Sequence, residues 1–348
     1  MTQEPIMIGY LGELKLTHGY LAAKYFKKAL EGAGIIVEQV KLLEKGYKNH
    51  EAVADAVKKG EVSFGLIAVE NSYEGIVQES ALILSRKLTG SDVRICCEIK
   101  IPIEHYLISL SKDIEKIKKI YAHKVAHGQC RHVGLPRVFS GRDIEFEETK
   151  NTAEAAEKMS QDPESAALLT EDGKCKENYG KEFAGILEIL AYGKGKEGVH
   201  DEEKVALATR FLAISSTHTL RCAGAQKILD DKKSELKSQG SGNERATVLF
   251  TLDRNKSGEL FKVLEVFAKK EINISIATIY PCPIPSKPFE YNFLLDCDLV
   301  REKVSYEEQF TKAIDEYNLT SGHHAIVLGR YPIIDLTIPT TQTSTEKE

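Results

Sequence analysis

The segment 70–77 carries the polar side chains that are best placed to do chemistry in this sequence. It reads Glu-Asn-Ser-Tyr-Glu-Gly-Ile-Val and directly follows the apolar run 64–69, which is typical of a strand buried on both faces. In open α/β sheets ligands bind at the carboxyl ends of strands, where Asn71 and Ser72 offer side-chain donors and backbone N–H groups can face an anion. The alternative is an ordinary polar turn, which the spacing alone favours.

A hydroxyl and a guanidinium stand side by side at Thr209 and Arg210, inside the apolar run 206–215. Such a pair can bind or protonate an oxygen of an anionic substrate. The alternative is a half-buried strand whose arginine faces water or an acidic partner, and the pattern alone favours it. Two further candidates are His123 at a strand-to-helix turn and Thr152 at a helix start, where a hydroxyl can bind an anion, but each is by itself a common capping residue.

The overall composition narrows the classes of function. The chain has 348 residues and a formal net charge of −5, so it has no basic footprint and nucleic acid is not an expected partner. It contains neither the Gly-x-Ser-x-Gly of serine hydrolases nor the Gly-x-x-x-x-Gly-Lys of ATPases. No apolar run is long enough to cross a membrane, and the start lacks the basic and apolar segments of a signal peptide, so no membrane partner is expected.

The cysteines favour a reducing compartment. There are seven, an odd number, and they are scattered along the chain without a Cys-x-x-Cys pair. This argues against a disulfide framework and predicts reduced thiols in the cytoplasm. No cluster of His, Cys and carboxylates has metal-ligand spacing, so neither a metal nor another cofactor is expected.

Short apolar runs alternate with amphipathic stretches through the first two-thirds of the chain. The pattern predicts strands at 6–10, 35–37 and 64–69, with helices at 21–30 and 50–59 between them. This order predicts a mostly parallel sheet with helices packed on it. Further helices are expected at 81–88, 125–133 and 152–159, and further strands at 93–101, 106–110, 120–122, 144–148, 166–169, 186–189 and 206–215.

The last third of the chain changes character twice. Residues 221–245 are polar and end in a Gly/Ser cluster, which predicts a linker. Residues 246–332 follow the order strand, helix, strand, strand, helix, strand, which is the ferredoxin-like arrangement, with its second and last strands expected at 274–280 and 325–328. Residues 333–348 are rich in Thr, Glu and Lys and are predicted to be a disordered tail.

Taken in order, these segments resemble one family, the prephenate dehydratases. The resemblance covers about residues 5–330, is close at 70–77, and includes the Thr209-Arg210-Phe211 triplet that is the family's best-known signature. The C-terminal part resembles an ACT domain, a small regulatory unit. Further matching segments are 98–105, His123, Gln129-Cys130 and 152–156.

The resemblance implies a catalytic region at 5–220 made of two α/β lobes, like a type II periplasmic binding protein. The first lobe is placed at 5–72 plus 196–220 and the second at 73–195, with the substrate in the cleft between them. The resemblance therefore implies an α/β fold with a two-lobed catalytic region, followed by the ferredoxin-like ACT domain at 246–332.

The activity that the resemblance implies is that of a hydro-lyase in phenylalanine biosynthesis, which expels the ring hydroxyl and CO2 from prephenate to give phenylpyruvate. Aromatisation drives this reaction, so the site needs hydrogen-bond donors and positive charge rather than a metal, a cofactor or a covalent nucleophile. The resemblance gives Thr209 the role of engaging the leaving hydroxyl. The substrate-binding residues that it implies are Asn71, Ser72, Glu70, Thr152, Gln129, Arg210 and Phe211. The regulatory residues that it implies are Gly258, Leu260, Asn273 and Pro281.

The sequence departs from the family pattern in three places. The first loop, 11–18, keeps only Leu11 and Gly12 of the usual Gly- and Pro-rich motif, and Leu207 replaces an asparagine. The ACT motif Glu-Ser-Arg-Pro is Thr-Ile-Tyr-Pro at 278–281. Two hypotheses follow: an active dehydratase with weakened feedback by L-phenylalanine, or a catalytically impaired paralogue that acts as a ligand-binding or regulatory subunit. In either case the resemblance implies a homodimer or homotetramer.

Overall fold

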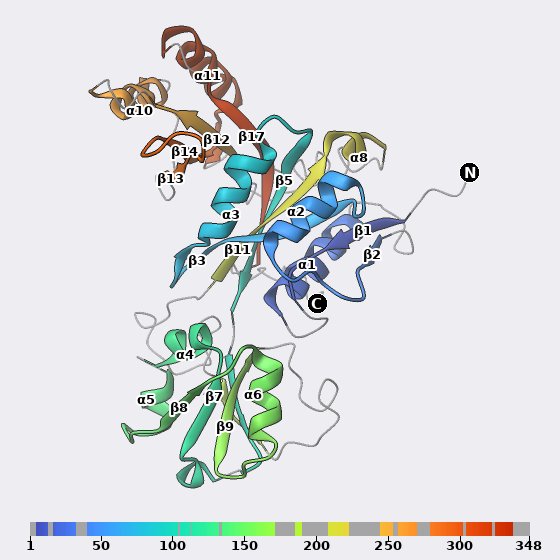
Figure 1. Cartoon of the computed structure of the whole chain (residues 1–348), viewed down its shortest axis with the longest axis vertical. Coiled ribbons are helices and arrows are strands. Elements are labelled where there is room, and N and C mark those ends of the chain that lie inside the picture. Colours follow the sequence, from blue (N-terminus) through green and yellow to red (C-terminus); the bar gives the residue numbers. More distant parts are fainter. Residues whose placement is uncertain are drawn as a thin grey trace, which may run out of the picture.

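The protein is a two-lobed α/β region with a third, C-terminal unit joined to its first lobe (Figure 1). The computed structural model describes residues 5–12, 17–32, 40–103, 105–111, 113–131, 134–170, 185–189, 208–222, 244–252, 257–269, 279–301, 304–321 and 324–336.

The first lobe contains one part of a ten-stranded sheet. The strand order of the whole sheet is β13-β14-β12-β17-β5-β11-β3-β1-β2, and β4 pairs with β3. The sequence predicts a mostly parallel sheet, which holds only in part: β1 is parallel to both β2 and β3, whereas β11 is antiparallel to both β3 and β5. Its strands are β1 (Ile6–Gly9), β2 (Val40–Leu42), β3 (Phe64–Asn71), β4 (Gly75–Ile76), β5 (Val93–Pro102) and β11 (Ala208–Ser216). Its helices are α1 (His18–Gly32), α2 (His50–Lys59), α3 (Gln78–Ile83), the π-helix η2 (Leu84–Leu88) and α8 (Thr217–Cys222).

Helix α2 shows why the local sequence folds as expected. Asn49 caps its start by accepting a hydrogen bond from the Ala52 N–H at 2.9 Å, and Gly60 ends it in the left-handed conformation with φ of 76°. A side chain on Gly65 of β3 would come within 2.8 Å of Val53 and Val57, so the glycine lets the helix lie close to the sheet. The helix predicted at 50–59 is confirmed.

The second lobe has its own five-stranded sheet, of order β10-β6-β9-β7-β8. Strand β7 is parallel to β8 and β9, so helices α4 and α6, which follow β7 and β8, begin at the same edge of this sheet. The strands are β6 (His105–Ser109), β7 (Lys119–Ala122), β8 (Glu145–Glu148), β9 (Ser165–Thr170) and β10 (Gly185–Ile189). The helices are η3 (Ile114–Lys116), α4 (Lys124–Cys130), α5 (Gly134–Val138) and α6 (Thr152–Met159).

The boundary between the lobes differs from the expected one. The sequence places the second lobe at 73–195, but β5 is a central strand of the large sheet, paired with β11 on one side and β17 on the other. Its side chains are buried on both faces, which only a position inside the sheet provides. The first lobe therefore runs to Pro102, and the second begins at His105.

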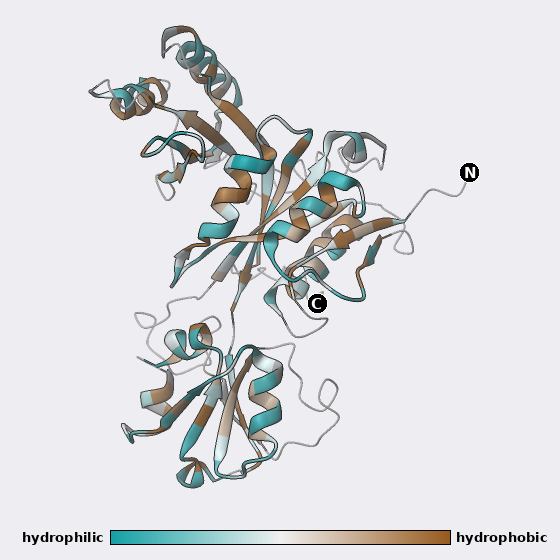
Figure 2. Ribbon diagram, viewed as in Figure 1, coloured by the Kyte–Doolittle hydropathy of each residue, from teal (hydrophilic) through white to brown (hydrophobic). Residues whose placement is uncertain are grey.

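The C-terminal unit adds four strands to the large sheet in the order β13-β14-β12-β17, with two helices whose apolar faces pack together on Phe250, Phe267, Phe310 and Tyr317. Figure 2 shows that strands β12 and β17 are largely apolar, whereas the two helices carry both apolar and polar residues. The elements are β12 (Glu244–Thr251), α10 (Glu259–Lys269), β13 (Ile279–Pro283), β14 (Tyr291–Asp298), α11 (Glu307–Ser321) and β17 (Ile326–Asp335), with the hairpin β15 (Val300–Arg301) and β16 (Val304–Ser305).

Strand β17 is longer than expected and joins the C-terminal unit to the first lobe. It pairs with β12 from Ile326 to Pro332, and then Ile333–Asp335 runs parallel to Glu98–Lys100 of β5. The prediction of a disordered tail at 333–348 is therefore wrong for its first residues, which belong to β17. Ile333 is buried there, and the Lys100 ammonium lies 3.1 Å from the Asp335 carboxylate. Sequence periodicity did not reveal this extension.

Some sequence predictions fall on residues that the structure does not describe. The expected strand at 35–37 and most of the one at 274–280 lie outside them, as do residues 223–243 of the expected linker, whereas Glu244 and Arg245 already belong to β12. In the part of the chain that the structure describes, no helix has both the length and the apolar character needed to span a bilayer, and no group of metal-ligating side chains is arranged around an ion site.

Candidate active site

Thr209 and Asn71 meet at the carboxyl end of β3. The two residues are direct partners in the antiparallel pairing of β11 with β3, and the Asn71 Nδ2 donates a hydrogen bond to the Thr209 Oγ1 at 3.0 Å. Thr209 is buried. The hydroxyl and the amide-rich turn, which lie far apart in the sequence, thus form one site.

The orientation of the Asn71 side chain is fixed by the turn that follows it. The backbone N–H groups of Tyr73 and Glu74 donate to the Asn71 Oδ1 at 2.9 and 3.0 Å. The oxygen therefore points into the turn and the NH2 group faces Thr209. Since the Thr209 oxygen accepts this hydrogen bond, its own proton can be donated to another acceptor, such as an oxygen of a substrate.

Gln129 carries this network from the first lobe to the second. Its Nε2 donates to the Asn71 Oδ1 at 3.2 Å, and its Oε1 lies 2.6 Å from the Nε2 of His105. Because Gln129 uses its NH2 group on Asn71, its oxygen is the acceptor, which assigns the His105 proton to Nε2. A continuous chain of hydrogen bonds therefore runs from Thr209 to His105 across the two lobes.

Two histidines lie at the end of this chain, and neither was predicted as a site residue. The rings of His18 in α1 and His105 in β6 meet edge to face with centroids 6.3 Å apart. Burial lowers the pKa of His105, and burial together with the neighbouring His105 lowers the pKa of His18 to about 3. Both imidazoles are therefore neutral at physiological pH. The only sequence signals were the altered first loop that holds His18 and the matching segment that ends at His105.

These neutral histidines predict that the protein loses stability in mild acid. Since the folded-state pKa values are lowered, the unfolded chain binds more protons once the pH falls below about 6.5. Stability is fully present above that pH and is lost as the pH falls toward about 3, the folded-state pKa of His18. The slope is at most about 1.4 kcal/mol per histidine per pH unit. Urea unfolding of the wild type and of His18→Gln at several pH values measures it, and equal slopes would contradict the prediction.

Ser72 and Thr17 use their hydroxyls within the first lobe. The Ser72 N–H donates to the Ala208 carbonyl at 2.9 Å, and the Ala208 N–H donates to the Ser72 Oγ at 2.9 Å, which fastens the turn to the start of β11. Thr17 donates to the Leu11 carbonyl at 3.1 Å and accepts from the Tyr20 N–H at 3.3 Å, at the start of α1. The Ser72 hydroxyl thus holds the turn that follows Asn71, and the Thr17 hydroxyl holds the start of α1, where His18 lies.

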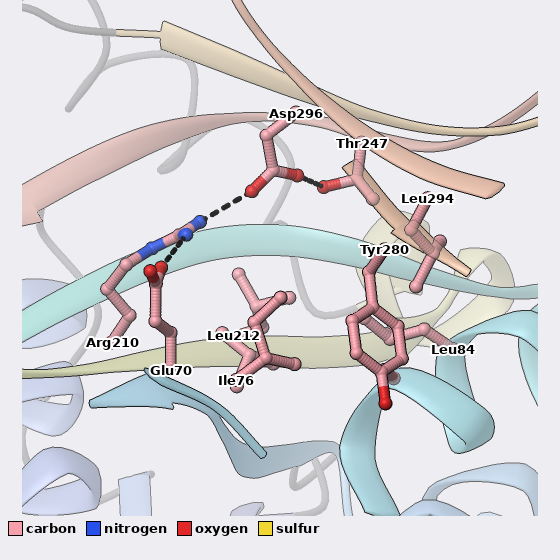
Figure 3. Close-up of a pocket in the computed structure, with 11 residues that line it drawn as sticks. Glu70, Ile76, Leu84, Arg210, Leu212, Thr247, Tyr280, Leu294 and Asp296 are labelled. Atoms are coloured by element: carbon pink, nitrogen blue, oxygen red, sulfur yellow. Dashed lines mark hydrogen bonds and ion pairs between the residues drawn. The ribbon is translucent and has the colours of Figure 1, made fainter. Parts of the chain in front are cut away.

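Arg210 points away from Thr209, as successive side chains of a strand do. Its guanidinium pairs with Glu70 of β3 and Asp296 of β14 (Figure 3). It also pairs with Glu98 of β5. The structure thus places Glu70 and Arg210, two residues expected to bind substrate, in an ion cluster. Phe211, also expected there, is buried in the core against α1.

The ion cluster is buried between the first lobe and the C-terminal unit. Glu98 is completely buried and also pairs with Arg245, which in turn pairs with Asp298. Burial alone would raise the pKa of Asp296, but the Arg210 and Arg245 guanidiniums hold it below its usual value. A cavity of about 30 Å³, with Glu70 and Arg210 in its wall, lies beside the cluster and has room for a water molecule.

The remaining predicted site residues belong to α6 and to the C-terminal part of the chain. Thr152 begins α6, at the same sheet edge as α4, and Asn151 caps that helix by accepting from the Glu154 N–H at 2.9 Å. Of the predicted regulatory residues, Gly258 precedes α10 with φ of 79°, and Leu260 and Pro281 are exposed. Asn273 lies outside the described residues.

A family model and the curated relatives of this chain point to the same family. The family model "Prephenate dehydratase" matches residues 8–219. A bifunctional chorismate mutase/prephenate dehydratase of Aquifex aeolicus is 30% identical over 79% of this chain, and the chain spans 63% of the length of that relative.

Two solved structures share the fold over 94% of this chain. The prephenate dehydratase of Staphylococcus aureus is 20% identical with a TM-score of 0.64 and is covered over 100% of its length. The prephenate dehydratase of Arthrobacter aurescens, in complex with L-Phe, is 20% identical with a TM-score of 0.61 and is covered over 89%.

Proposed function

Because this chain belongs to the prephenate dehydratase family, we propose that it converts prephenate to phenylpyruvate. The observation that carries this proposal is the hydrogen-bond chain from Thr209 through Asn71 and Gln129 to His105. It joins the family's signature threonine to both lobes, so a substrate held between the lobes would meet an oriented hydroxyl. The reaction makes the chain a hydro-lyase of L-phenylalanine biosynthesis.

The geometry suggests how Thr209 acts. As the bond between the ring and its carboxylate breaks, CO2 leaves and the electron pair of that bond completes the aromatic ring while the C–O bond to the ring hydroxyl breaks. The Thr209 hydroxyl, held by the Asn71 amide at 3.0 Å, donates a hydrogen bond to the departing oxygen. That oxygen takes up a proton and leaves as water. A threonine is a weak acid, so its contribution depends on this orientation.

The other predicted residues are assigned around this step. Asn71 and Gln129 orient Thr209, and Ser72 fastens the turn beside it. Thr152, at the N-terminus of α6, is proposed to receive a substrate carboxylate, because the N–H groups of a helix start favour an anion. The ring of prephenate then lies between the two lobes.

The direct test is to add prephenate to the purified chain and to measure the absorbance of phenylpyruvate. The matched control is Thr209→Ala, which keeps the backbone but lacks the hydroxyl. Turnover above this control is expected. If the wild type gave no more phenylpyruvate than Thr209→Ala, the chain would be a ligand-binding or regulatory subunit instead.

For the C-terminal unit we propose an ACT regulatory domain. Its strand order, β13-β14-β12-β17 with two helices on one face, supports a ferredoxin-like fold. Family relatives of known structure include one in complex with L-Phe, which makes L-phenylalanine the natural effector to test. We also propose a homodimer or homotetramer paired through these domains, and a cytoplasmic location.

Phenylalanine is expected to leave the activity of this chain nearly unchanged. The motif Glu-Ser-Arg-Pro that the family carries at its effector site is Thr-Ile-Tyr-Pro at 278–281, without its charged pair. The loss of two charged partners weakens the binding of an amino acid zwitterion. A titration of phenylalanine against initial rate measures the effect, and sigmoidal inhibition would contradict the expectation.

A further inference from the structure

Thr209 and Arg210 connect the catalytic strand to different parts of the molecule. Thr209 faces Asn71, whereas Arg210 faces the ion cluster on the other side of β11. The Arg210 guanidinium donates to Glu98 at 3.0 and 2.9 Å and to Asp296 at 2.8 Å, and it also pairs with Glu70. Its side chain is only 11% exposed. Because three carboxylates of the protein surround it, the Arg210 guanidinium forms its ion pairs within the fold.

Two of the three carboxylates come from the strands that flank β11, and the third comes from the C-terminal unit. Glu70 and Glu98 belong to β3 and β5, the two strands that flank β11 in the sheet. Asp296 belongs to β14 of the C-terminal unit and is held in turn by the Thr247 hydroxyl at 2.7 Å. Thus the residue after the catalytic threonine is fixed partly by the C-terminal unit.

The backbone pairing of β11 with β3 is irregular close to Thr209. Pairing of β11 with β3 is regular at Thr209 and Arg210 but shifts between Arg210 and Phe211, where the partners pass from Glu70 to Ala68. Such a bulge disturbs the ladder and re-aims the neighbouring side chains. Pairing of β11 with β5 stays regular from Ala208 to Ala213, so on the β3 side the direction of the Thr209 hydroxyl depends on side-chain contacts in addition to the ladder.

We propose that Arg210 is a positioning residue through which Asp296 of the C-terminal unit holds the Thr209 hydroxyl in place. This inference rests on the proposed function, since it assigns to the C-terminal unit a part in the same reaction. The connection is short: Asp296 contacts Arg210, and Arg210 is bonded to Thr209. A shift of β14 against the first lobe would therefore act on the catalytic hydroxyl through Arg210.

The test compares Asp296→Asn with Asp298→Asn in the full-length protein. Both carboxylates belong to β14, but Asp298 pairs with Arg245 at 2.9 Å and not with Arg210. Asp296→Asn is expected to lower kcat by about 10- to 100-fold, as a misplaced catalytic group does, with KM nearly unchanged. Asp298→Asn is expected to keep the wild-type kcat. Circular dichroism at the assay temperature establishes that each variant is folded.

Two further variants separate positioning from a general loss of structure. Thr247→Val removes the hydroxyl that holds Asp296 but leaves Arg210 and its carboxylates intact, so a smaller fall in kcat is expected even if Asp296→Asn does not fold. In the Thr209→Ala background, Asp296→Asn should have no further effect on the residual rate. Equal kcat values for the wild type and Thr247→Val, or an equal fall for Asp296→Asn and Asp298→Asn, would overturn the inference. A wild type without turnover would overturn the proposed function instead.

Discussion

Replacing Thr209 by valine is expected to lower kcat for prephenate by about 10²- to 10⁴-fold, the usual contribution of a positioned proton donor. Valine has the shape of threonine but no hydroxyl, so the core packing of β11 stays while the hydrogen bond to the leaving oxygen is lost. The Asn71 Nδ2, 3.0 Å from the Thr209 Oγ1, then loses its acceptor as well. Initial rates of phenylpyruvate formation measure the effect.

Thr209→Ser is the matched control, because serine keeps the hydroxyl and lacks only the methyl group. Its kcat is expected to stay within about 10-fold of the wild type, since the hydroxyl can still accept from Asn71. A kcat for Thr209→Val equal to that of Thr209→Ser would show that the hydroxyl takes no part in the reaction. KM should change little in both variants, because the interaction is made mainly as the C–O bond breaks.

Replacing Glu98 by alanine is expected to lower the free energy of unfolding by about 3–5 kcal/mol. Glu98 is completely buried and accepts hydrogen bonds from both Arg210 and Arg245 at 2.9 to 3.1 Å. Its removal leaves two buried guanidiniums with fewer anionic partners, and an uncompensated buried charge is far more costly than a broken surface pair. Urea unfolding followed by circular dichroism measures the loss.

The control for this prediction is the surface pair between Lys118 and Glu164, whose oxygen and nitrogen are 2.8 Å apart and whose side chains are 69% and 56% exposed. Glu164→Ala is expected to change the free energy of unfolding by less than about 1 kcal/mol. Comparable losses for Glu98→Ala and Glu164→Ala would show that burial does not set the strength of the cluster. Glu98 of the first lobe also pairs with Arg245 of the C-terminal unit. The loss of Glu98 should therefore separate the unfolding of the C-terminal unit from that of the first lobe.

Much of the fold was predictable because its signals are local. The helix at 50–59 has its cap, its apolar face and its terminal glycine within a dozen residues, and the strand beginning at Phe64 is marked by a continuous apolar run. The order of strands and helices predicts parallel pairing, which holds for β1 with β2 and β3, but β11 is antiparallel to both β3 and β5. The boundary between the lobes was misplaced, because local patterns show that β5 is a strand but do not show which sheet it joins.

The sequence by itself determined the order of the elements and the two segments of the site, since the asparagine turn after β3 and the threonine of β11 carry the family's motifs. Only the tertiary structure decided that Arg210 turns to Asp296, 86 residues away, that β17 continues beside β5, and that His18 meets His105. Periodicity reports which residues share one face of an element. It carries no information on which distant charge or strand packs against that face, because that depends on the register and packing of the whole chain.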